Sequence, residues 1–247
     1  MAQENPKEQK LRMDPKHQFR FNCYPGISCF TQCCQDINIA LTPYDVLRLR
    51  RALGMSSGEF IEKYTIIIPQ KKSLIPLVIL RMNEKDKRCP LVTQDGCIVY
   101  QDRPWSCRMY PLDMNRDGTF SMIPETSWCQ GLKQKDVWRI SDWLIDQGIV
   151  PYDEMNKLFS SMTLQLLAQK LAIDNPDISK MTFMALYNLD KFREFVFKST
   201  FLDRFDIDAK RIEEIKRHDE ELLKLGIDWI KFGLFGQKLF KVKQKPS

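Results

Sequence analysis

The sequence predicts an α+β protein, in which a small cysteine-rich α+β unit with a short antiparallel sheet precedes a mainly α-helical C-terminal half. All eight cysteines lie between Cys23 and Cys129, in a stretch that also carries β-branched runs and a hairpin signal. From Lys135 onward, apolar residues recur at helical spacing. The expected organisation is a mobile N-terminal segment (1–19), a cysteine-cluster metal-binding unit (20–132), a helical bundle (133–236) and a basic tail (237–247).

Capping signals and β-branched runs predict the elements of the first half. Thr42 and Ser56 each precede a carboxylate by three residues, the pattern of a helix N-cap with its capping box. β-Branched and apolar runs between turn residues indicate short strands. In chain order we expect helices 43–53 and 57–64, strands 65–69 and 74–82, a hairpin 88–100 turning at Asp95-Gly96, and a strand 119–123.

The second half is predicted to be helical to its end. Val137, Trp138 and Ile140 begin an apolar pattern of helical spacing, which Gly148 stops. The aromatic residues farther on are most simply core residues. We expect helices from Lys135 to Gly148 and over 151–171, one or two over 183–205, and a last helix over 209–235 that bends near Gly226.

Composition and charge exclude several classes of protein. With 43% apolar and 28% charged residues, the chain is an ordinary globular one. Its net charge of +6 is modest, so nucleic acid is not a favoured partner. No apolar run reaches the length of a membrane span, and the first sixteen residues lack a signal-peptide core. We therefore expect a cytoplasmic protein whose thiols serve metal or redox chemistry in preference to disulfides.

The cysteines form two sequence groups of four, and cysteine sets of this size usually hold zinc or an iron–sulfur cluster. Their spacing alone does not identify the metal. Adjacent side chains point in different directions, so Cys33 and Cys34 either serve different centres, or one binds metal while the other packs in the core or supports the site. Eight thiols allow two centres, or one centre with spare cysteines. The predicted metal ligands are Cys23, Cys29, Cys33, Cys34, Cys89, Cys97, Cys107 and Cys129.

Arginines beside the second sequence group would offset the negative charge of four metal-bound thiolates. Arg88 precedes Cys89, and Arg103 and Arg108 flank Cys107. We expect these three guanidinium groups to support the cofactor site by donating to its sulfurs. The alternative is that they are exposed or paired with nearby aspartates, Asp102 and Asp113.

The sequence offers few residues or motifs for other kinds of catalysis. The two histidines, His17 and His218, are too few for a histidine-rich metal site and give no basis for a triad. No glycine-rich phosphate loop occurs. The catalytic residues of an enzyme, if it is one, are therefore unassigned.

Several motifs follow one another in a specific order. They are Cys23-x5-Cys29-x3-Cys33-Cys34, Cys89-Pro90-Leu91, Gly96-Cys97-Ile98-Val99-Tyr100, Arg103-Pro104 and Cys107-Arg108-x-Tyr110-Pro111. Over residues 20–130 this order resembles the YkgJ-type cysteine-cluster proteins, described as zinc- or iron-chelating domains. The resemblance implies an iron–sulfur or zinc centre in a bacterial-type cytosolic protein, and it implies no reaction. A flagellin lysine methylase has a similar cysteine region, which adds methyl transfer as an alternative.

We thus expect a metal-binding protein that holds one or two cysteine-ligated centres, with iron–sulfur favoured over zinc. A cluster would serve electron transfer, whereas zinc would only hold the fold because it has no redox chemistry. One alternative is a metal-stabilised enzyme such as a protein lysine N-methylase. Another is a zinc-stabilised interaction module that docks through its aromatic-rich C-terminal helices. The expected partner is the metal ion or cluster; the sequence indicates no membrane and leaves a protein partner open.

Overall fold

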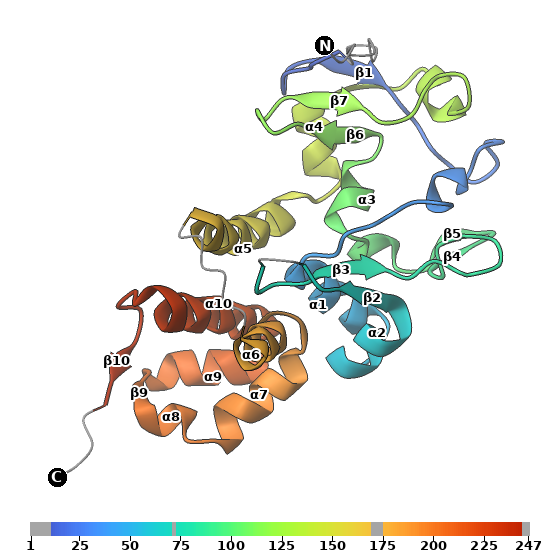
Figure 1. The fold of residues 1–247 in the computed structure, drawn as a ribbon. Helices are drawn as coiled ribbons and strands as arrows, with labels where there is room; N and C mark the ends of the chain where they lie inside the picture. Colours follow the sequence, from blue (N-terminus) through green and yellow to red (C-terminus); the bar gives the residue numbers. More distant parts are fainter. Residues whose placement is uncertain (1–10, 71–72, 169–174, 244–247) are drawn as a thin grey trace, which may run out of the picture.

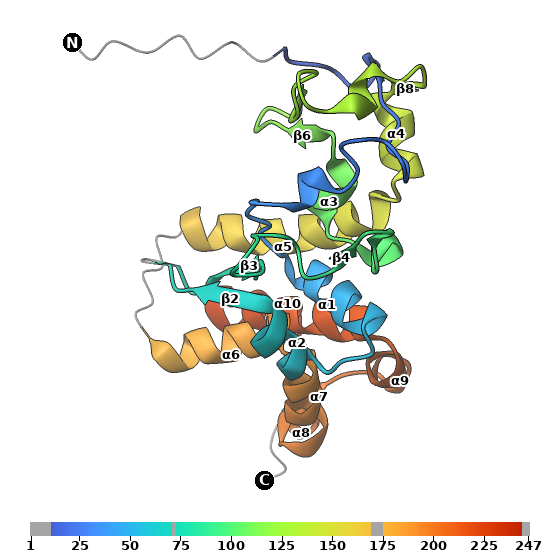
Figure 2. The same cartoon turned by 90° about the vertical axis from the view of Figure 1, so that its right-hand side faces the viewer.

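A computed structural model describes residues 11–70, 73–168 and 175–243. Short two-stranded antiparallel sheets lie in the N-terminal half, and helices make up most of the C-terminal half, so the predicted α+β class is confirmed. Across these residues, no helix is both long and apolar enough to cross a bilayer. In Figures 1 and 2 the molecule is elongated, with β1 and β6–β8 at one end, α7–α9 at the other, and α1, α2, β2, β3 and α5 between them.

The first half alternates strands with short helices. Its strands are β1 Gln18–Arg20, β2 Thr65–Ile68, β3 Leu77–Leu80, β4 Val92–Thr93, β5 Gly96–Cys97, β6 Leu112–Met114, β7 Phe120–Met122 and β8 Val137–Arg139. Its helices are α1 Pro43–Ala52, α2 Ser57–Tyr64 and α3 Trp105–Met109. Single 3-10 turns occur at Gln32–Cys34, Tyr100–Asp102 and Gln130–Lys133.

The second half consists of helices with one small sheet. The helices are α4 Ile140–Asp146, α5 Val150–Ala168, α6 Pro176–Tyr187, α7 Leu189–Lys198, α8 Phe201–Arg204, α9 Ala209–Arg217 and α10 Asp219–Phe235. Strand β9 (Phe205–Asp206) pairs with β10 (Lys241–Val242), which lies in the segment expected as a basic tail. Residues 1–10 of the expected N-terminal segment, 169–171 of the expected helix 151–171 and 244–247 of the tail lie outside the described residues.

The capping signals place α1 and α2 correctly. The Thr42 hydroxyl accepts from the Asp45 N–H at 3.3 Å, and the Asp45 carboxylate accepts from the Thr42 N–H at 2.8 Å. Ser56 and Glu59 form the same reciprocal pair at the start of α2. Each box satisfies amide donors that the first helical turn leaves free, which fixes where the helix begins.

The predicted strands 65–69, 74–82 and 119–123 contain β2, β3 and β7, and β2 pairs with β3 from Thr65↔Leu80 onward. The hairpin 88–100 is shorter than predicted, because only Val92–Thr93 pairs with Gly96–Cys97 in regular strands. Its first arm turns away before β4, since the Cys89 N–H donates to the Cys34 carbonyl at 2.8 Å. This bond joins the two sequence groups of cysteines.

The prediction of a helix from Lys135 is wrong at its start, because Val137–Arg139 form strand β8 and the helix begins at Ile140. Strand β8 pairs with β1, with Phe19 opposite Trp138. The Trp138 indole N–H also donates to the Phe21 carbonyl at 3.0 Å. Pairing with a segment more than a hundred residues away outweighs the local helical pattern, and it draws Gln18 and Phe19 of the expected N-terminal segment into the fold.

The predicted bend near Gly226 is also wrong. The break falls at His218, whose extended backbone separates α9 from α10. Gly226 lies inside α10, where an added Cβ would stand 2.5 Å from the Ala185 carbonyl oxygen of α6. The glycine therefore permits close packing of two helices, not a bend. The segment 183–205 spans parts of three helices, and the first begins at Pro176 with its N-cap at Asn175.

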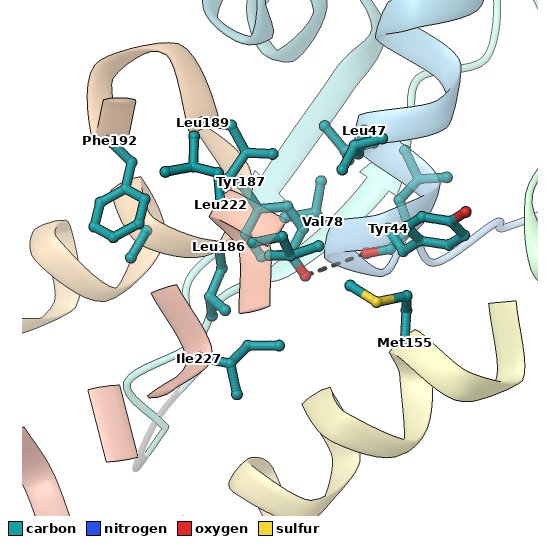
Figure 3. Close-up of a cluster of buried hydrophobic side chains, with 14 of the residues drawn as sticks. Tyr44, Leu47, Val78, Met155, Leu186, Tyr187, Leu189, Phe192, Leu222 and Ile227 are labelled. Atoms are coloured by element: carbon teal, nitrogen blue, oxygen red, sulfur yellow. Dashed lines mark hydrogen bonds between the residues drawn. The ribbon is translucent and has the colours of Figure 1, made fainter. Parts of the chain in front are cut away.

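Two hydrophobic cores hold the molecule together. The larger one joins α1, α2 and β3 to the C-terminal helices, and Figure 3 shows Leu47, Val78 and Leu222 converging in it. A bond of 3.2 Å from the Tyr187 hydroxyl to the Leu41 carbonyl crosses this core. The smaller core lies under β1, β6, β7 and α4. Trp105 packs against both cores, so the start of α3 is the point where they meet.

Gly226→Ala should lower the free energy of unfolding by about 1–3 kcal/mol, because the new methyl group must displace backbone. Gly233→Ala is the matched control in the same helix, since a Cβ there meets nothing within 4 Å. It should raise stability by about 0.5–1 kcal/mol through its helix propensity. Urea denaturation measures both. Equal effects of the two variants would contradict close packing at Gly226.

Candidate metal centre

The eight cysteines are carried by segments that the fold brings together from across more than a hundred residues, and all are free thiols. Cys33 and Cys34 lie in the 3-10 turn Gln32–Cys34, Cys97 lies in β5 and Cys107 lies in α3. Cys23 and Cys29 lie in the irregular segment after β1. Cys89 precedes β4, and Cys129 is the N-cap of the 3-10 turn Gln130–Lys133.

Four thiols gather around Cys107, and we name them the Cys107 group: Cys34, Cys89, Cys97 and Cys107. Burial raises the pKa of the Cys107 thiol, and the neighbouring thiols of the other three raise it further. Burial likewise raises the pKa of Cys89 to about 11, with Cys34 and Cys97 contributing. Cys89 belongs to the larger core, and the other three pack against it. This group is therefore attached to the core that includes the C-terminal helices.

Backbone amides support two sulfurs of the Cys107 group in the same way. The Leu91 N–H donates to the Cys89 sulfur, and the Val99 N–H donates to the Cys97 sulfur. In both cases the donor stands two residues after the cysteine and lowers the thiol pKa, but burial raises that pKa by more, so the net shift is upward. An amide that points at sulfur stabilises a thiolate, which is the form that binds metal.

A second set adjoins the first, and we name it the Cys23 group: Cys23, Cys29, Cys33 and Cys129. Burial raises the pKa of Cys23 to about 11, and nearby Cys29 and Cys129 add to the shift. The Cys29 sulfur accepts from the Gln130 N–H at 3.3 Å. Cys129 is buried in the smaller core, at 3% exposure. Sequence position did not predict this grouping, because Cys129 joins three cysteines of the N-terminal segment.

The adjacent thiols of Cys33 and Cys34 connect the two groups. Cys33 donates a hydrogen bond to Cys34, which raises the pKa of Cys33 and lowers that of Cys34. Cys33 is also close to Cys23 and Cys107, and Cys34 affects the pKa of all three other thiols in its group. The eight sulfurs thus form one continuous assembly with this pair at its middle.

The thiols are not spaced for a single bound ion. A zinc ion holds four sulfurs at about 2.3 Å in a tetrahedron, which places neighbouring sulfurs about 3.8 Å apart. Across residues 11–70, 73–168 and 175–243, no three histidine, cysteine, aspartate or glutamate side chains gather closely enough to hold one ion. The two groups are therefore loose sets of soft donors.

Two of the three predicted arginines lie beside sulfur. Arg88 lowers the pKa of the Cys34 thiol by its charge, and it donates to the Thr31 hydroxyl at 2.8 Å. Arg103 lies near Cys97 and Cys107; burial raises the pKa of Cys97, and the charge of Arg103 opposes that rise. Both are thus placed to offset negative charge on the Cys107 group.

Arg108 has a different environment. It is 5% exposed, and its guanidinium donates to the carbonyls of Arg103 at 3.0 Å and Gln147 at 2.6 Å, and to that of Gln101. It also donates to the Tyr152 hydroxyl at 3.1 Å. These bonds tie α3 to the junction of α4 and α5. The alternative pairing with Asp102 does not occur, because that carboxylate pairs with Arg48.

The sequence did not indicate two residues of the site. Asp45, 1% exposed, accepts from the Trp105 N–H at 2.8 Å while it completes the α1 capping box, so one carboxylate fixes the start of both α1 and α3. The Tyr110 hydroxyl donates to the Cys129 sulfur at 3.7 Å. In the sequence, Asp45 is recognisable only as a member of the α1 capping box, and Tyr110 only as a residue of the Cys107-Arg108-x-Tyr110-Pro111 motif.

The helical half contains a separate cleft of about 490 Å³, between α5, α9 and α10. Two of its ion pairs are Arg211 of α9 with Asp228 of α10 at 2.7 Å and, within α10, Lys224 with Glu221 at 2.8 Å. None of the predicted site residues lines it. The cleft therefore lends no support to an enzyme active site built on the cysteines.

Arg108→Lys should lower the free energy of unfolding by about 3 kcal/mol. The planar guanidinium of Arg108 donates to several buried oxygens at once, and the single ammonium group of a lysine cannot replace those hydrogen bonds. Arg88→Lys is the control, with one hydrogen bond at a less buried position, and should cost about 1 kcal/mol or less. Thermal and urea unfolding of both variants test this. A stable Arg108→Lys protein would show that its bonds contribute little.

No curated protein and no solved structure matches the chain. Residues 22–135 match the family CxxCxxCC, whose description is "Putative zinc- or iron-chelating domain". The matched segment contains all eight cysteines and both groups of thiols, so the expected resemblance to a cysteine-cluster family is confirmed. Over residues 22–135 the chain is thus similar to the CxxCxxCC family of zinc- or iron-chelating domains.

Proposed function

We propose that the protein binds two cysteine-ligated metal centres, one held by the Cys107 group and the other by the Cys23 group. The observation that carries this proposal is that all eight cysteines are free thiols, of which Cys34, Cys89 and Cys97 raise the pKa of Cys107 while Cys29 and Cys129 raise that of Cys23. We assign the boundary between the two sets to the neighbours Cys33 and Cys34. Adjacent side chains point apart, so the pair can serve two centres more easily than one. Four cysteines complete the usual ligand set of zinc or of an iron–sulfur cluster.

The proposal favours iron–sulfur clusters over single zinc ions. A cluster contains several iron and sulfide ions, so its cysteine ligands stand farther apart than the sulfurs around one ion. The thiols of each group affect one another's pKa, but within the described residues no three of them converge at single-ion spacing. This arrangement fits a larger cofactor better.

The chain's own residues would hold and tune such centres. The amides of Leu91 and Val99 and the charges of Arg88 and Arg103 stabilise thiolates in the Cys107 group. Hydrogen bonds and cations near sulfur raise the reduction potential of a cluster, since they favour the more negative, reduced form. The bound clusters would supply one-electron chemistry, and we propose electron transfer as the role. A cytoplasmic location would keep unligated thiols reduced.

Cys97→Ser and Cys107→Ser should each lose one centre and unfold at lower temperature, because metal binding at such sites contributes folding free energy on the order of 10 kcal/mol. Ser106→Ala is the matched control. It changes a neighbour of Cys107 whose buried hydroxyl has no hydrogen-bond partner, and it should keep full metal content. Metal analysis and thermal unfolding measure the effects. Unchanged metal content in both serine variants would contradict the assignment of the Cys107 group.

The identity of the metal is tested by anaerobic purification followed by iron, zinc and sulfide analysis and an absorption spectrum. The proposal expects iron and acid-labile sulfide in similar amounts, with visible absorption that bleaches on reduction. A colourless protein with stoichiometric zinc would contradict the proposed electron-transfer role. The metal would then have a structural role, because zinc has no redox chemistry.

A further inference from the structure

Strand β2 is an aliphatic edge strand that the rest of the chain leaves partly exposed. It carries three consecutive isoleucines, Ile66, Ile67 and Ile68, which are 46%, 42% and 39% exposed. Successive side chains of a strand point to opposite faces, so both faces of β2 are open to solvent. Within the part of the chain that the structure describes, β2 contacts mainly β3 and the preceding helix α2.

The backbone of β2 alternates between groups that bond to β3 and groups that point away from it. In β3, the Leu80 N–H donates to the Ile39 carbonyl at 2.9 Å, so the backbone groups of Leu80 point away from β2. Leu80 stands opposite Thr65, and two opposite residues of an antiparallel pair either both bond across it or both point outward. The N–H and C=O of Thr65, and of Ile67 two residues farther on, therefore point to the free edge.

This free edge is closed at its ends and open at its centre. The Thr65 N–H donates to the Ile61 carbonyl, and the Thr65 carbonyl accepts from the Arg81 guanidinium at 2.8 and 3.2 Å. Pro69 has no N–H to offer. Among the described residues, none accepts from the Ile67 N–H or donates to the Ile67 carbonyl. The edge thus offers one donor and one acceptor, both on Ile67.

We propose that two copies of this chain associate through β2, with Ile67 of one copy opposite Ile67 of the other on a two-fold axis. A two-fold axis pairs identical surfaces, so each Ile67 N–H meets the carbonyl of its counterpart and two hydrogen bonds form. In this register Ile66 lies opposite Ile68 of the other copy, which gives aliphatic pairs across the strands. Residues 65–70 carry no charged side chain that would oppose its own copy.

The geometry limits the association to two copies. The other edge of β3 is already used, because Ala40 pairs with Ile79 across it. Joining two β2 strands therefore gives a sheet of order β3-β2-β2-β3 in which neither β2 keeps an open edge. One short strand per copy makes a small interface, so a dissociation constant on the order of 100 μM is expected. Strands β2 and β3 contain no cysteine, so the inference does not depend on metal binding.

The test is sedimentation equilibrium of the full-length protein from about 5 μM to about 1 mM. A reductant keeps the free thiols from cross-linking the copies. The average mass should rise from one chain toward two, and the Ile67 amide should exchange its hydrogen more slowly at high concentration. The Thr65 amide is the internal control, since its bond to Ile61 exists in the single chain. A mass of one chain at every concentration, or growth beyond two, would overturn the inference.

Two variants test the register. Ile67→Lys and Ile67→Glu each place like charges opposite one another on the two-fold axis, so each alone should weaken association about tenfold or more with an unchanged circular dichroism spectrum. An equal mixture of the two variants should associate again, because opposite charges then face each other. Leu164→Lys, at a 64% exposed position of α5, is the control and should associate like the wild type. Wild-type association of Ile67→Lys, or a mixture that stays monomeric, would contradict the proposed pairing.

Discussion

The adjacency of Cys33 and Cys34 in one 3-10 turn is the constraint on which the candidate site depends. Two consecutive residues cannot direct their side chains to one small ion, so the chain must place them in different surroundings. The 3-10 turn does this at the boundary between the Cys107 group and the Cys23 group. The same turn accepts the Cys89 N–H at the Cys34 carbonyl, which brings in the hairpin that carries Cys97. One short turn thus organises sulfurs from distant segments.

A second junction links the cysteine unit to the helices. Trp105 packs against both hydrophobic cores, and its indole N–H donates to Asp153 of α5 at 2.7 Å while its backbone N–H donates to Asp45. Cys107 stands two residues later in the same short helix. Because α3 is only one turn long, its position is determined by these anchors and by Arg108, not by its own helical bonds. The helical half therefore contributes to the site by positioning Cys107.

Local signals in the sequence account for much of the fold. The capping boxes at Thr42 and Ser56 place α1 and α2 to within a residue, because they act through neighbours in the chain. Local signals could not show that Val137–Arg139 would pair with Gln18–Arg20, or that Gly226 would be used for a close contact with Ala185. The same limit applies to the site. Motif order indicated which cysteines matter, but the sorting of Cys129 with Cys23 and Cys29 depends on long-range packing.

The two groups also differ in how they compensate the charge of thiolates. Arg88 and Arg103 stand beside the Cys107 group, whereas the pKa of Cys23 is raised by partial burial of its thiol within an otherwise exposed residue and by other thiols. A buried anion without a nearby cation is costly, and water is the remaining source of stabilisation. Cys23 is exposed and can be solvated directly. Exposure of Cys23 thus offers solvation to a thiolate of the Cys23 group that has no arginine among the causes of its pKa shift.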